Sequence, residues 1–458
     1  MKKIWRTLPM IVLAVSVFVP GGKAQNVTTY ILQSPSLAQA QAACLTYGMV
    51  MVSTIHDPDT YIVQVSASVP ADVLKQWVEH DPNVRHLEVD TKVSPPEKSV
   101  SVPPYVPSLP ATSYVADGNL IRLYGKTAWL GYIQQPAMYS MNAADTVAHN
   151  ATGAGIVAVI DTGIDPDNPI LASVLVPGYD FIRNSPGFAS DLADINQSTA
   201  HILHQSTAHI LHGYQMMQLN GTTVGLLDAD TASALQGASL PSDFGHGTMV
   251  AGLIHLVAPT AKIMPLKAFN ADGSADTADI IRAIYFAADN GARVINMSFG
   301  LPLISDALMK AVNYATRKGV ICVASVGNDG QATLMYPAAF GNVIGVASVD
   351  QQNKQSTFSN FGPDLVTIAA PGEALITTYP GNHYAAVWGT SFSSALVSGA
   401  AVDLLSIIDP KIASQLAVGD ITRAISKANT CGTAGSLGAG CLDFNQAEQF
   451  LHATNLPH

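Results

Sequence analysis

The spacing of apolar and polar positions divides the chain into two regions of different texture. In the first, residues 25–94, short β-type runs lie between two helical stretches. The pattern predicts strands at residues 28–33, 49–54, 60–66 and 85–93, and helices at residues 37–47 and 71–80. The order βαββαβ is that of a ferredoxin-like module, so we expect a small α+β domain here.

From about residue 126 the strands become continuous apolar runs that alternate with longer helical stretches. The predicted strands are residues 155–160, 262–265, 294–297, 320–326, 343–346 and 365–368, and the predicted helices are residues 277–290, 305–318 and 391–408. Such a pattern is typical of a parallel sheet that helices cover on both faces. Residues 126–458 are therefore predicted to be one large α/β domain. Before it, residues 95–125 are rich in Pro and predict an extended linker.

The first 24 residues have the pattern of a signal peptide. Lys2, Lys3 and Arg6 form a basic start, residues 8–19 are mostly apolar, and small residues precede a cut after Ala24. The apolar run is too short to span a bilayer, and no later stretch of about 18 apolar residues follows. We therefore expect a secreted protein, extracellular or periplasmic, without a membrane anchor.

A duplicated octapeptide lies inside an apparent insertion at about residues 185–240. Residues 197–204 recur unchanged as residues 205–212. The two copies bring four histidines, which would bind a divalent metal if they converged: His201, His204, His209 and His212. We interpret them as copied residues of a solvated surface insertion, because no Cys or carboxylate spacing supports a metal site.

Composition and charge limit the functions that fit this chain. Apolar residues make up 48% of the sequence and charged residues 12%, which is typical of a globular protein with a large core. The formal net charge of -11 argues against nucleic-acid binding, which needs a basic face. We expect no nucleic-acid partner.

The four cysteines, in an exported chain, permit disulfides. Together they allow three full pairings. Cys431 and Cys441 flank a Gly/Ala/Ser-rich stretch that is flexible enough to bring them together, whereas Cys322 lies inside an apolar run. We predict one disulfide, Cys431–Cys441, and a buried thiol at Cys322.

Four polar residues stand where predicted strands end or helices begin. Asp161 closes a strand in Asp-Thr-Gly, and ligands bind at the carboxyl ends of parallel strands in α/β folds. His246 lies between two glycines before an apolar helix, and Ser391 begins another helix after Gly-Thr. A helix start supplies free backbone N–H groups and the positive end of the helix dipole. Asn328, in Val-Gly-Asn-Asp-Gly, can offer a side-chain amide.

These residue types, taken together, suit peptide hydrolysis. A serine nucleophile needs an imidazole base, the imidazole needs a carboxylate, and the tetrahedral oxyanion needs preorganised donors. Each motif alone is weak, since Asp-Thr-Gly also surrounds the carboxylates of aspartic proteases, although no second copy occurs in this chain. The chain order Asp, His, Ser is that of subtilisin and differs from the orders in α/β-hydrolases and chymotrypsin-like enzymes.

The chain resembles the subtilases, serine peptidases of the subtilisin family, over most of residues 126–455. Further matching segments lie at residues 296–300, 336–338, 358–362 and 370–372. The resemblance implies that Asp161, His246 and Ser391 form a catalytic triad. It implies a secreted serine endopeptidase that works through an acyl-enzyme intermediate.

The resemblance also assigns the surroundings of the triad. Asn328, with the backbone N–H of Ser391, is expected to form the oxyanion hole. Ser298, Phe299 and Gly300 resemble the edge that pairs with an extended substrate as an added strand. Residues 25–94 resemble the inhibitory propeptide of secreted subtilases. We therefore expect a self-processed zymogen, monomeric when mature, whose partners are protein or peptide substrates and its own propeptide.

Several positions depart from the family pattern. Met249 stands where the family has a His three residues after the catalytic His, and Ala395 and Leu396 replace a usual Pro-His pair. Pro169 is followed by Ile170, where many subtilases have an Asp that ligates calcium. We expect no cofactor in the chemistry, and a structural calcium ion stays open with its metal ligands unknown.

An alternative function is a catalytically idle subtilase fold that acts as a binding protein. Idle relatives usually lack a member of the triad, and this chain contains all three residue types. The complete triad therefore favours the enzyme.

Overall fold

The computed structural model describes most of the chain in two compact units. The described residues are 26–56, 59–93, 119–123, 126–143, 153–205, 215–219, 222–226, 235, 240–408, 414–427, 431 and 436–454. The predicted signal peptide and most of the predicted linker lie outside them. The two units divide between Thr91 and Lys92.

The first unit is a four-stranded antiparallel sheet with two helices. Its elements, in chain order, are β1 (Val27–Gln33), α1 (Leu37–Tyr47), β2 (Val50–His56), β3 (Thr60–Ser66), α2 (Ala71–Val78) and β4 (His86–Val89). The strand order β2-β3-β1-β4 and the alternation βαββαβ confirm the ferredoxin-like module. Ser36 caps the start of α1 and Gly48, with φ 66°, ends it.

The strand predicted over residues 85–93 is divided in the structure. β4 stays in the first unit, whereas β5 (Lys92–Val93) belongs to the second and pairs antiparallel with β14 (Ala275–Asp276). An ion pair of 2.6 Å joins Lys92 to Asp276, and the side chain of Val93 is buried. The pairing of Val93 with Ala275 explains why the chain leaves the first sheet after β4.

The second unit is built on an eight-stranded sheet. Its strand order is β10-β9-β13-β8-β15-β16-β17-β18. The strands are β8 (Ile156–Asp161), β9 (Gly178–Asp180), β10 (Ser185–Gly187), β13 (Lys262–Lys267), β15 (Ala292–Met297), β16 (Ile321–Ser325), β17 (Val343–Val349) and β18 (Ile368–Pro371). All neighbours pair in parallel except the edge strand β10. The predicted parallel α/β sheet is confirmed.

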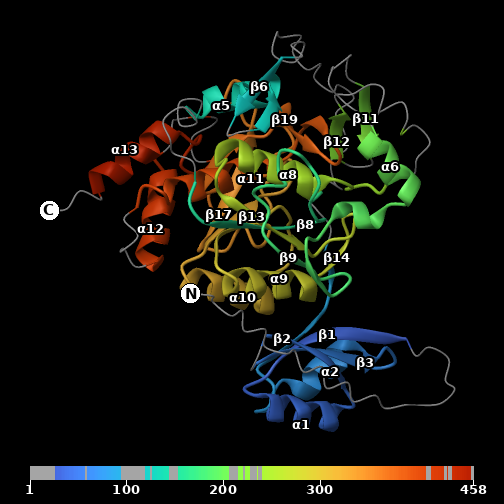
Figure 1. Ribbon diagram of the computed structural model, residues 1–458. Helices are drawn as coiled ribbons and strands as arrows, with labels where there is room; N and C mark the ends of the chain where they lie inside the picture. The colour runs from blue at the N-terminus through green and yellow to red at the C-terminus, as the bar shows by residue number, and fades with distance from the viewer. Residues whose placement is uncertain are drawn as a thin grey trace, which may run out of the picture. The chain divides into compact units, whose positions relative to one another are not determined.

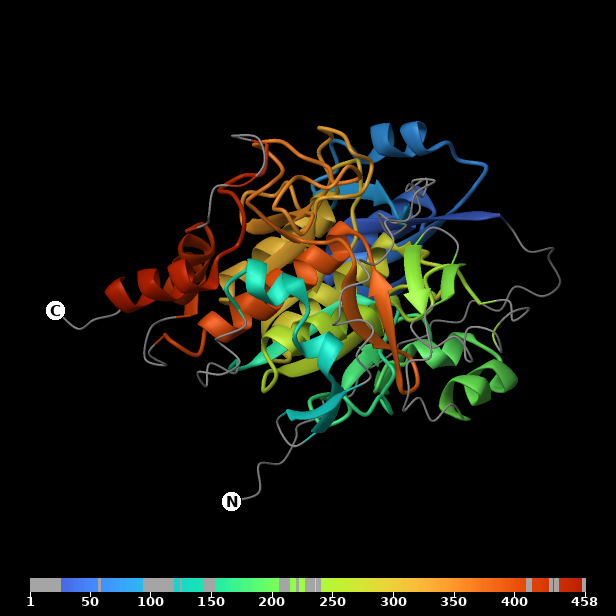
Figure 2. The same cartoon turned by 90° about the horizontal axis from the view of Figure 1, so that it is seen from above.

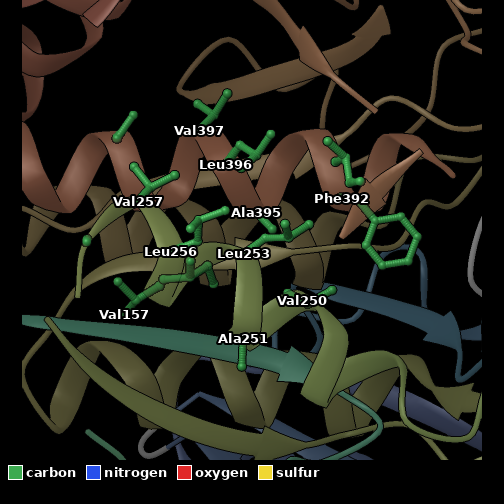
Figure 3. Packing of buried hydrophobic residues seen from close by; sticks show 14 of the residues in the cluster. Val157, Val250, Ala251, Leu253, Leu256, Val257, Phe392, Ala395, Leu396 and Val397 are labelled. Carbon is green, nitrogen blue, oxygen red and sulfur yellow. The ribbon is translucent and has the colours of Figure 1, made fainter. Parts of the chain in front are cut away.

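Helices cover both faces of this sheet. In Figure 1, α8 (His246–Val257) and α11 (Thr390–Leu404) lie above the strands, and α9 (Thr277–Asp289) and α10 (Asp306–Arg317) lie below them. Figure 3 shows Leu253 and Val257 of α8 facing Ala395 and Leu396 of α11. Every residue of these two helices is buried, so neither helix has a solvent-facing side and their few polar residues also lie inside the protein.

The last predicted strand of the sheet is displaced in the structure. Residues 365–368 were expected to be extended, but β18 begins only at Ile368. The backbone N–H groups of Leu365 and Val366 donate to the carbonyl of Gly362, so this apolar segment forms a turn. Apolar character alone does not distinguish a buried turn from a strand.

A second sheet uses the insertion. β11 (Gln215–Leu219) and β12 (Thr222–Leu226) form a hairpin, and β12 extends the hairpin of β19 (Leu375–Tyr379) and β20 (His383–Val387). Part of the predicted surface loop is therefore a structural component of the domain.

The first octad also packs rather than standing free in solvent. It forms α6 (Gln197–Gln205), and Leu203 lies in the main hydrophobic core. The carbonyl of Leu203 lies 3.0 Å from Nε2 of His383 in β20. The second copy, beyond Gln205, lies outside the described residues.

Smaller elements complete the second unit. The end of the predicted linker forms β6 (Leu120–Leu123), which pairs with β7 (Lys126–Trp129), followed by α4 (Leu130–Ile133) and α5 (Pro136–Ser140). A short 3-10 helix, η2, spans Asp191–Asp194. The helices α12 (Ser414–Ile425) and α13 (Phe444–Thr454) pack together on the side opposite α6 (Figure 2).

The four cysteines of the chain are either bridged or buried. Cys431 and Cys441 form a disulfide, and Cys44 and Cys322 are buried thiols. Burial raises the pKa of Cys322 to about 12, which keeps it protonated.

Among the described helices, none combines the length and apolarity that crossing a bilayer requires.

A buried carboxyl group on α11 predicts a pH-dependent stability. Burial and the charge of Glu448 raise the pKa of Asp403 to about 7, against about 3.9 in an unfolded chain. The folded state then binds more protons between these values. The contribution of Asp403 to the stability of the folded state is therefore greatest below about pH 4, and up to roughly 4 kcal/mol of it is lost as pH rises to 7.

Asp403→Asn should remove this loss because the amide stays neutral. Urea unfolding between pH 4 and 8 checks it: the variant should be more stable than wild type at pH 8 and should match it near pH 4. Equal pH profiles of the two proteins would contradict the assignment.

Candidate active site

Asp161 is the last residue of β8, at the carboxyl edge of the parallel sheet. Its Oδ1 accepts a hydrogen bond of 2.7 Å from the backbone N–H of Thr162. The residue is only 4% exposed. The neighbouring strands β13 and β15 hold it in register, since Lys267 pairs with Asp161 and Met297 pairs with Ile160.

His246 is the first residue of α8 and faces that carboxylate. Its Nδ1 lies 2.8 Å from Oδ1 of Asp161, and both side chains are buried. A carboxylate can only accept, so the proton lies on Nδ1 and Nε2 is left as the basic nitrogen. Gly245 precedes it with φ 83°, and a side chain at Gly247 would overlap the carbonyl of Gly163. Gly247 therefore allows the close approach of α8 to the end of β8, and Gly245 allows the approach to Tyr379 and Pro380.

Ser391 lies in the first turn of α11. The aromatic ring of the next residue, Phe392, contacts the imidazole of His246 at a centroid distance of 5.4 Å. Oγ of Ser391 lies 3.5 Å from the carbonyl of Ser298, at the carboxyl end of β15. The three residues that the sequence singled out are thus gathered at one edge of the sheet, from β8 and from the starts of α8 and α11.

Asn328 lies in the loop that follows β16. Its Oδ1 accepts two hydrogen bonds from Thr390, at 2.9 Å from the backbone N–H and 2.8 Å from Oγ1. Because the amide oxygen is held by these donors, the Nδ2 end of the amide is oriented as a hydrogen-bond donor. Thr390 directly precedes Ser391, so this contact joins the Asn328 loop to the serine.

Ser298, Phe299 and Gly300 follow β15 at the same edge. Oγ of Ser298 donates to the carbonyl of Ser391 at 3.2 Å, and the ring of Phe299 packs on Phe269 in the interior. Ser298 and Phe299 are therefore buried, and Gly300 is the partly exposed residue of the segment. Leu301 exchanges two backbone hydrogen bonds with Tyr336, which fixes the end of the segment.

Comparisons with known proteins agree with this geometry. A family model described as the subtilase family matches residues 153–440. The chain belongs to the subtilase family. It is 35% identical over 280 residues to a thermophilic serine proteinase of Bacillus sp. (strain AK1), and 34% identical over 252 residues to thermitase of Thermoactinomyces vulgaris. These alignments cover 61% and 55% of this chain, and 59% and 75% of the relatives.

A solved structure shows the same fold. The crystal structure of fervidolysin from Fervidobacterium pennivorans, a keratinolytic enzyme related to subtilisin, matches with a TM-score of 0.65 at 19% identity. The match covers 93% of this chain and 61% of that chain. The subtilisin-like fold predicted from the motifs is therefore confirmed.

The positions that depart from the usual subtilase pattern lie in the core. Met249, Ala395 and Leu396 are buried in the packing between α8, α11 and the second sheet. The carbonyl of Met249 accepts a 2.5 Å hydrogen bond from Thr377 of β19. An apolar residue at each position fits this dry environment.

The sequence did not predict a buried lysine close to Asp161. Lys267, the last residue of β13, is fully buried and donates to the carbonyls of Thr162 and Phe269 and to Oδ2 of Asp194, at 2.5, 2.9 and 2.6 Å. Thr162 follows Asp161, and its Oγ1 accepts from the N–H of Gly247. The signal that could have found it is a charged residue at the end of an apolar strand, opposite Asp161.

A second buried network was also missed. Oγ1 of Thr248, two residues after His246, accepts from the N–H of Asp165 at 2.8 Å and donates to Asp191 at 2.7 Å. Burial, followed by the charge of Asp165, raises the pKa of Asp191 well above its usual range. Asp191 belongs to η2, so the start of the insertion anchors the first turn of α8.

The structure provides no metal centre within its described part. Groups of three or more His, Cys, Asp or Glu side chains that could hold an ion are absent from the described residues. Of the duplicated histidines, His209 and His212 lie outside them. The calcium ligands left open from the sequence stay unidentified.

Thr248→Val should destabilise the subtilase domain. The methyl group keeps the volume but leaves the N–H of Asp165 and the carboxyl of Asp191 without their hydroxyl partner, at a cost of about 1–3 kcal/mol. The free energy of unfolding in urea measures it. Thr248→Ser, which keeps the hydroxyl, is the matched control and should stay within about 1 kcal/mol of wild type. A loss in Thr248→Ser as large as the loss in Thr248→Val, although serine keeps the hydroxyl, would contradict the role given to the hydroxyl.

Proposed function

We propose that the chain is a secreted serine endopeptidase that cleaves proteins or peptides through an acyl-enzyme intermediate. The observation that carries the proposal is the 2.8 Å contact between Nδ1 of His246 and Asp161, with Ser391 at the start of the helix whose Phe392 packs on that imidazole. The named relatives, a serine proteinase and thermitase, support the same reaction class.

The reaction follows from the roles of these atoms. Oγ of Ser391 attacks the scissile carbonyl while Nε2 of His246 takes its proton and then delivers it to the leaving amine. The carboxylate of Asp161 holds the tautomer and stabilises the imidazolium that forms. Water then attacks the acyl-enzyme through the same proton transfers by His246, which releases the second product and restores Ser391. Three side chains thus provide nucleophile, base and orienting acid, and the chemistry requires no cofactor.

The charge on the tetrahedral oxygen needs donors that are in place before it develops. We assign this role to Nδ2 of Asn328 and the backbone N–H of Ser391. The extended substrate is proposed to bind along Ser298, Phe299 and Gly300. Main-chain hydrogen bonds at that edge would provide the affinity for the substrate, and side-chain pockets would select among substrate side chains.

We further propose that the chain is made as a precursor. The predicted signal peptide, the separate ferredoxin-like unit and the short pairing of β5 with β14 support this. Residues 92–93 thus form a two-residue antiparallel pairing with β14 of the second unit, where the chain that follows the first unit begins. The mature enzyme is proposed to be monomeric and to act outside the cytoplasm.

Ser391→Ala should give a folded protein without peptidase activity, because only the nucleophile is removed. Casein hydrolysis should fall by several orders of magnitude. Circular dichroism and urea unfolding, compared with wild type, control for folding. Casein hydrolysis that stays near the wild-type rate would remove Ser391 from the mechanism, and an inert wild type would favour the binding-protein alternative.

The precursor should process itself once, between about residues 93 and 125. In the Ser391→Ala variant the uncut chain should accumulate, whereas the wild type should give a new N-terminus that sequencing locates. Adding a trace of active wild-type enzyme to the variant separates cleavage within one molecule from cleavage between molecules. A Ser391→Ala chain that is recovered from the expressing cells already cut at the wild-type position would show that another peptidase matures the chain.

A further inference from the structure

We propose that Asn360 is a positioning residue for the oxyanion hole, which sets the backbone of the loop that carries Asn328. The proposal rests on the proposed function, because it concerns the rate of the same reaction. Asn360 lies 32 residues further along the chain and is fully buried. It acts on the reaction only through Asn328.

The side chain of Asn360 binds the Asn328 loop on both sides of Asn328. Before it, Nδ2 of Asn360 donates to the carbonyl of Val326 at 3.1 Å. After it, Oδ1 of Asn360 accepts from the backbone N–H groups of Asp329 at 3.0 Å and Gln331 at 3.1 Å. One amide group thus satisfies three peptide groups of a five-peptide turn, and it uses both its donor and its acceptor end.

The backbone of Asn360 adds to this attachment. Its N–H donates to the carbonyl of Gly327 at 3.0 Å. Gly327 has φ 100°, and a side chain there would come within 2.6 Å of Nδ2 of Asn360. The loop therefore needs glycine at 327 because the asparagine amide occupies the space beside it. Nδ2 also lies 3.3 Å from a carboxylate oxygen of Asp329, a weaker contact at the protein surface side of the loop.

Asn360 is itself held in place. The adjacent Ser359 donates to the carbonyl of Asn360 at 2.9 Å and accepts from the N–H of Ser348 in β17 at 2.9 Å. The asparagine is therefore tied to the central sheet. A rigid support of this kind can transmit the position of the sheet to the loop.

Two clamps then act on Asn328 from different directions. Thr390 holds the side-chain oxygen, and Asn360 holds the peptides on either side. An oxyanion donor contributes most when its position is fixed before the charge develops. Freeing the loop should misplace Nδ2 of Asn328 without changing the nucleophile, the base or the substrate edge.

The test is a double-mutant cycle between Asn360→Ala and Asn328→Ala, read as kcat and KM on a fluorogenic peptide that the wild type cleaves. Active enzyme is counted by titration with a serine-directed phosphonate. Asn360→Ala should lower kcat by about 10- to 100-fold and leave KM within about threefold. Asn328→Ala should lower kcat by about 100- to 1,000-fold.

The decisive variant carries both substitutions. If Asn360 acts through Asn328, the double variant should have a kcat within about threefold of Asn328→Ala alone, because no donor is left to position. Losses that multiply would overturn the proposal and assign Asn360 a general structural role. An unchanged kcat in Asn360→Ala would overturn it as well.

Two further variants protect the test. Ser356→Ala removes a buried hydroxyl of the same segment that bonds to Ser348, away from the Asn328 loop, and should leave kcat within about twofold. Asn360→Asp keeps the acceptor and loses the donor to Val326, and it serves if Asn360→Ala does not fold. Asn360→Asp should lower kcat by about 5- to 20-fold in the wild-type background, and it should not lower kcat further in the Asn328→Ala background. A wild type without Ser391-dependent hydrolysis would overturn the proposed function and this role together.

Discussion

The close packing of α8 against α11 is the constraint on which the site depends. His246 and Ser391, the proposed base and nucleophile, are at the starts of these two helices, so their separation is set by how the helices meet. A side chain at Gly399 of α11 would lie 2.7 Å from Val257 of α8, and one at Gly252 of α8 would overlap the threonine hydroxyls of β19. The absence of side chains at both glycines lets the three elements approach as closely as they do.

Such packing leaves the first turns of the helices in a dry environment, where polar groups must be paired inside the protein. At α8, Oγ1 of Thr162 accepts a hydrogen bond from the N–H of Gly247. The hydroxyl of Thr248 accepts from the N–H of Asp165 and donates to the carboxyl group of Asp191. At α11, Oδ1 of Asn328 accepts hydrogen bonds from both the backbone N–H and the hydroxyl of Thr390. Each helix start is therefore satisfied by a residue from another element, and the pairing that stabilises the fold also fixes the reacting groups.

The residues proposed to carry the chemistry could be singled out from the sequence because their signals are local. Asp161, His246, Ser391 and Asn328 each lie in a short motif at the end of a strand or the start of a helix, and the strand pattern placed these ends at one edge. Lys267 and Asp191 could not be predicted in the same way. Their partners are far away in the sequence, and only the parallel pairing of β8 with β13 brings Lys267 to Thr162.

The insertion at about residues 185–240 was expected to be solvated, but part of it is buried. Its repeated octad and its polar residues indicated a solvated loop, yet Leu203 lies in the core and Asp194 binds the buried Lys267. Leu203 and its neighbour Ile202 are the apolar residues that attach α6 to the core, and two apolar residues give no periodic signal that stands out in one sequence. Burial was decided by tertiary contacts with β20 and β13.

The topology of the catalytic unit also bears on the role of the small N-terminal unit. The central strand β8 pairs with β13 and β15, which begin at Lys262 and Ala292, more than 100 residues later. Loop-closure entropy must be overcome before any of these pairings stabilises the chain, so such sheets fold slowly. The first unit, in contrast, pairs strands that are close in the sequence and has its own core. A unit that folds early, and whose following residues pair with β14 at the start of α9, would present the late-folding unit with an ordered strand. The proposed precursor would then have a physical purpose in folding, independent of any inhibition of the finished site.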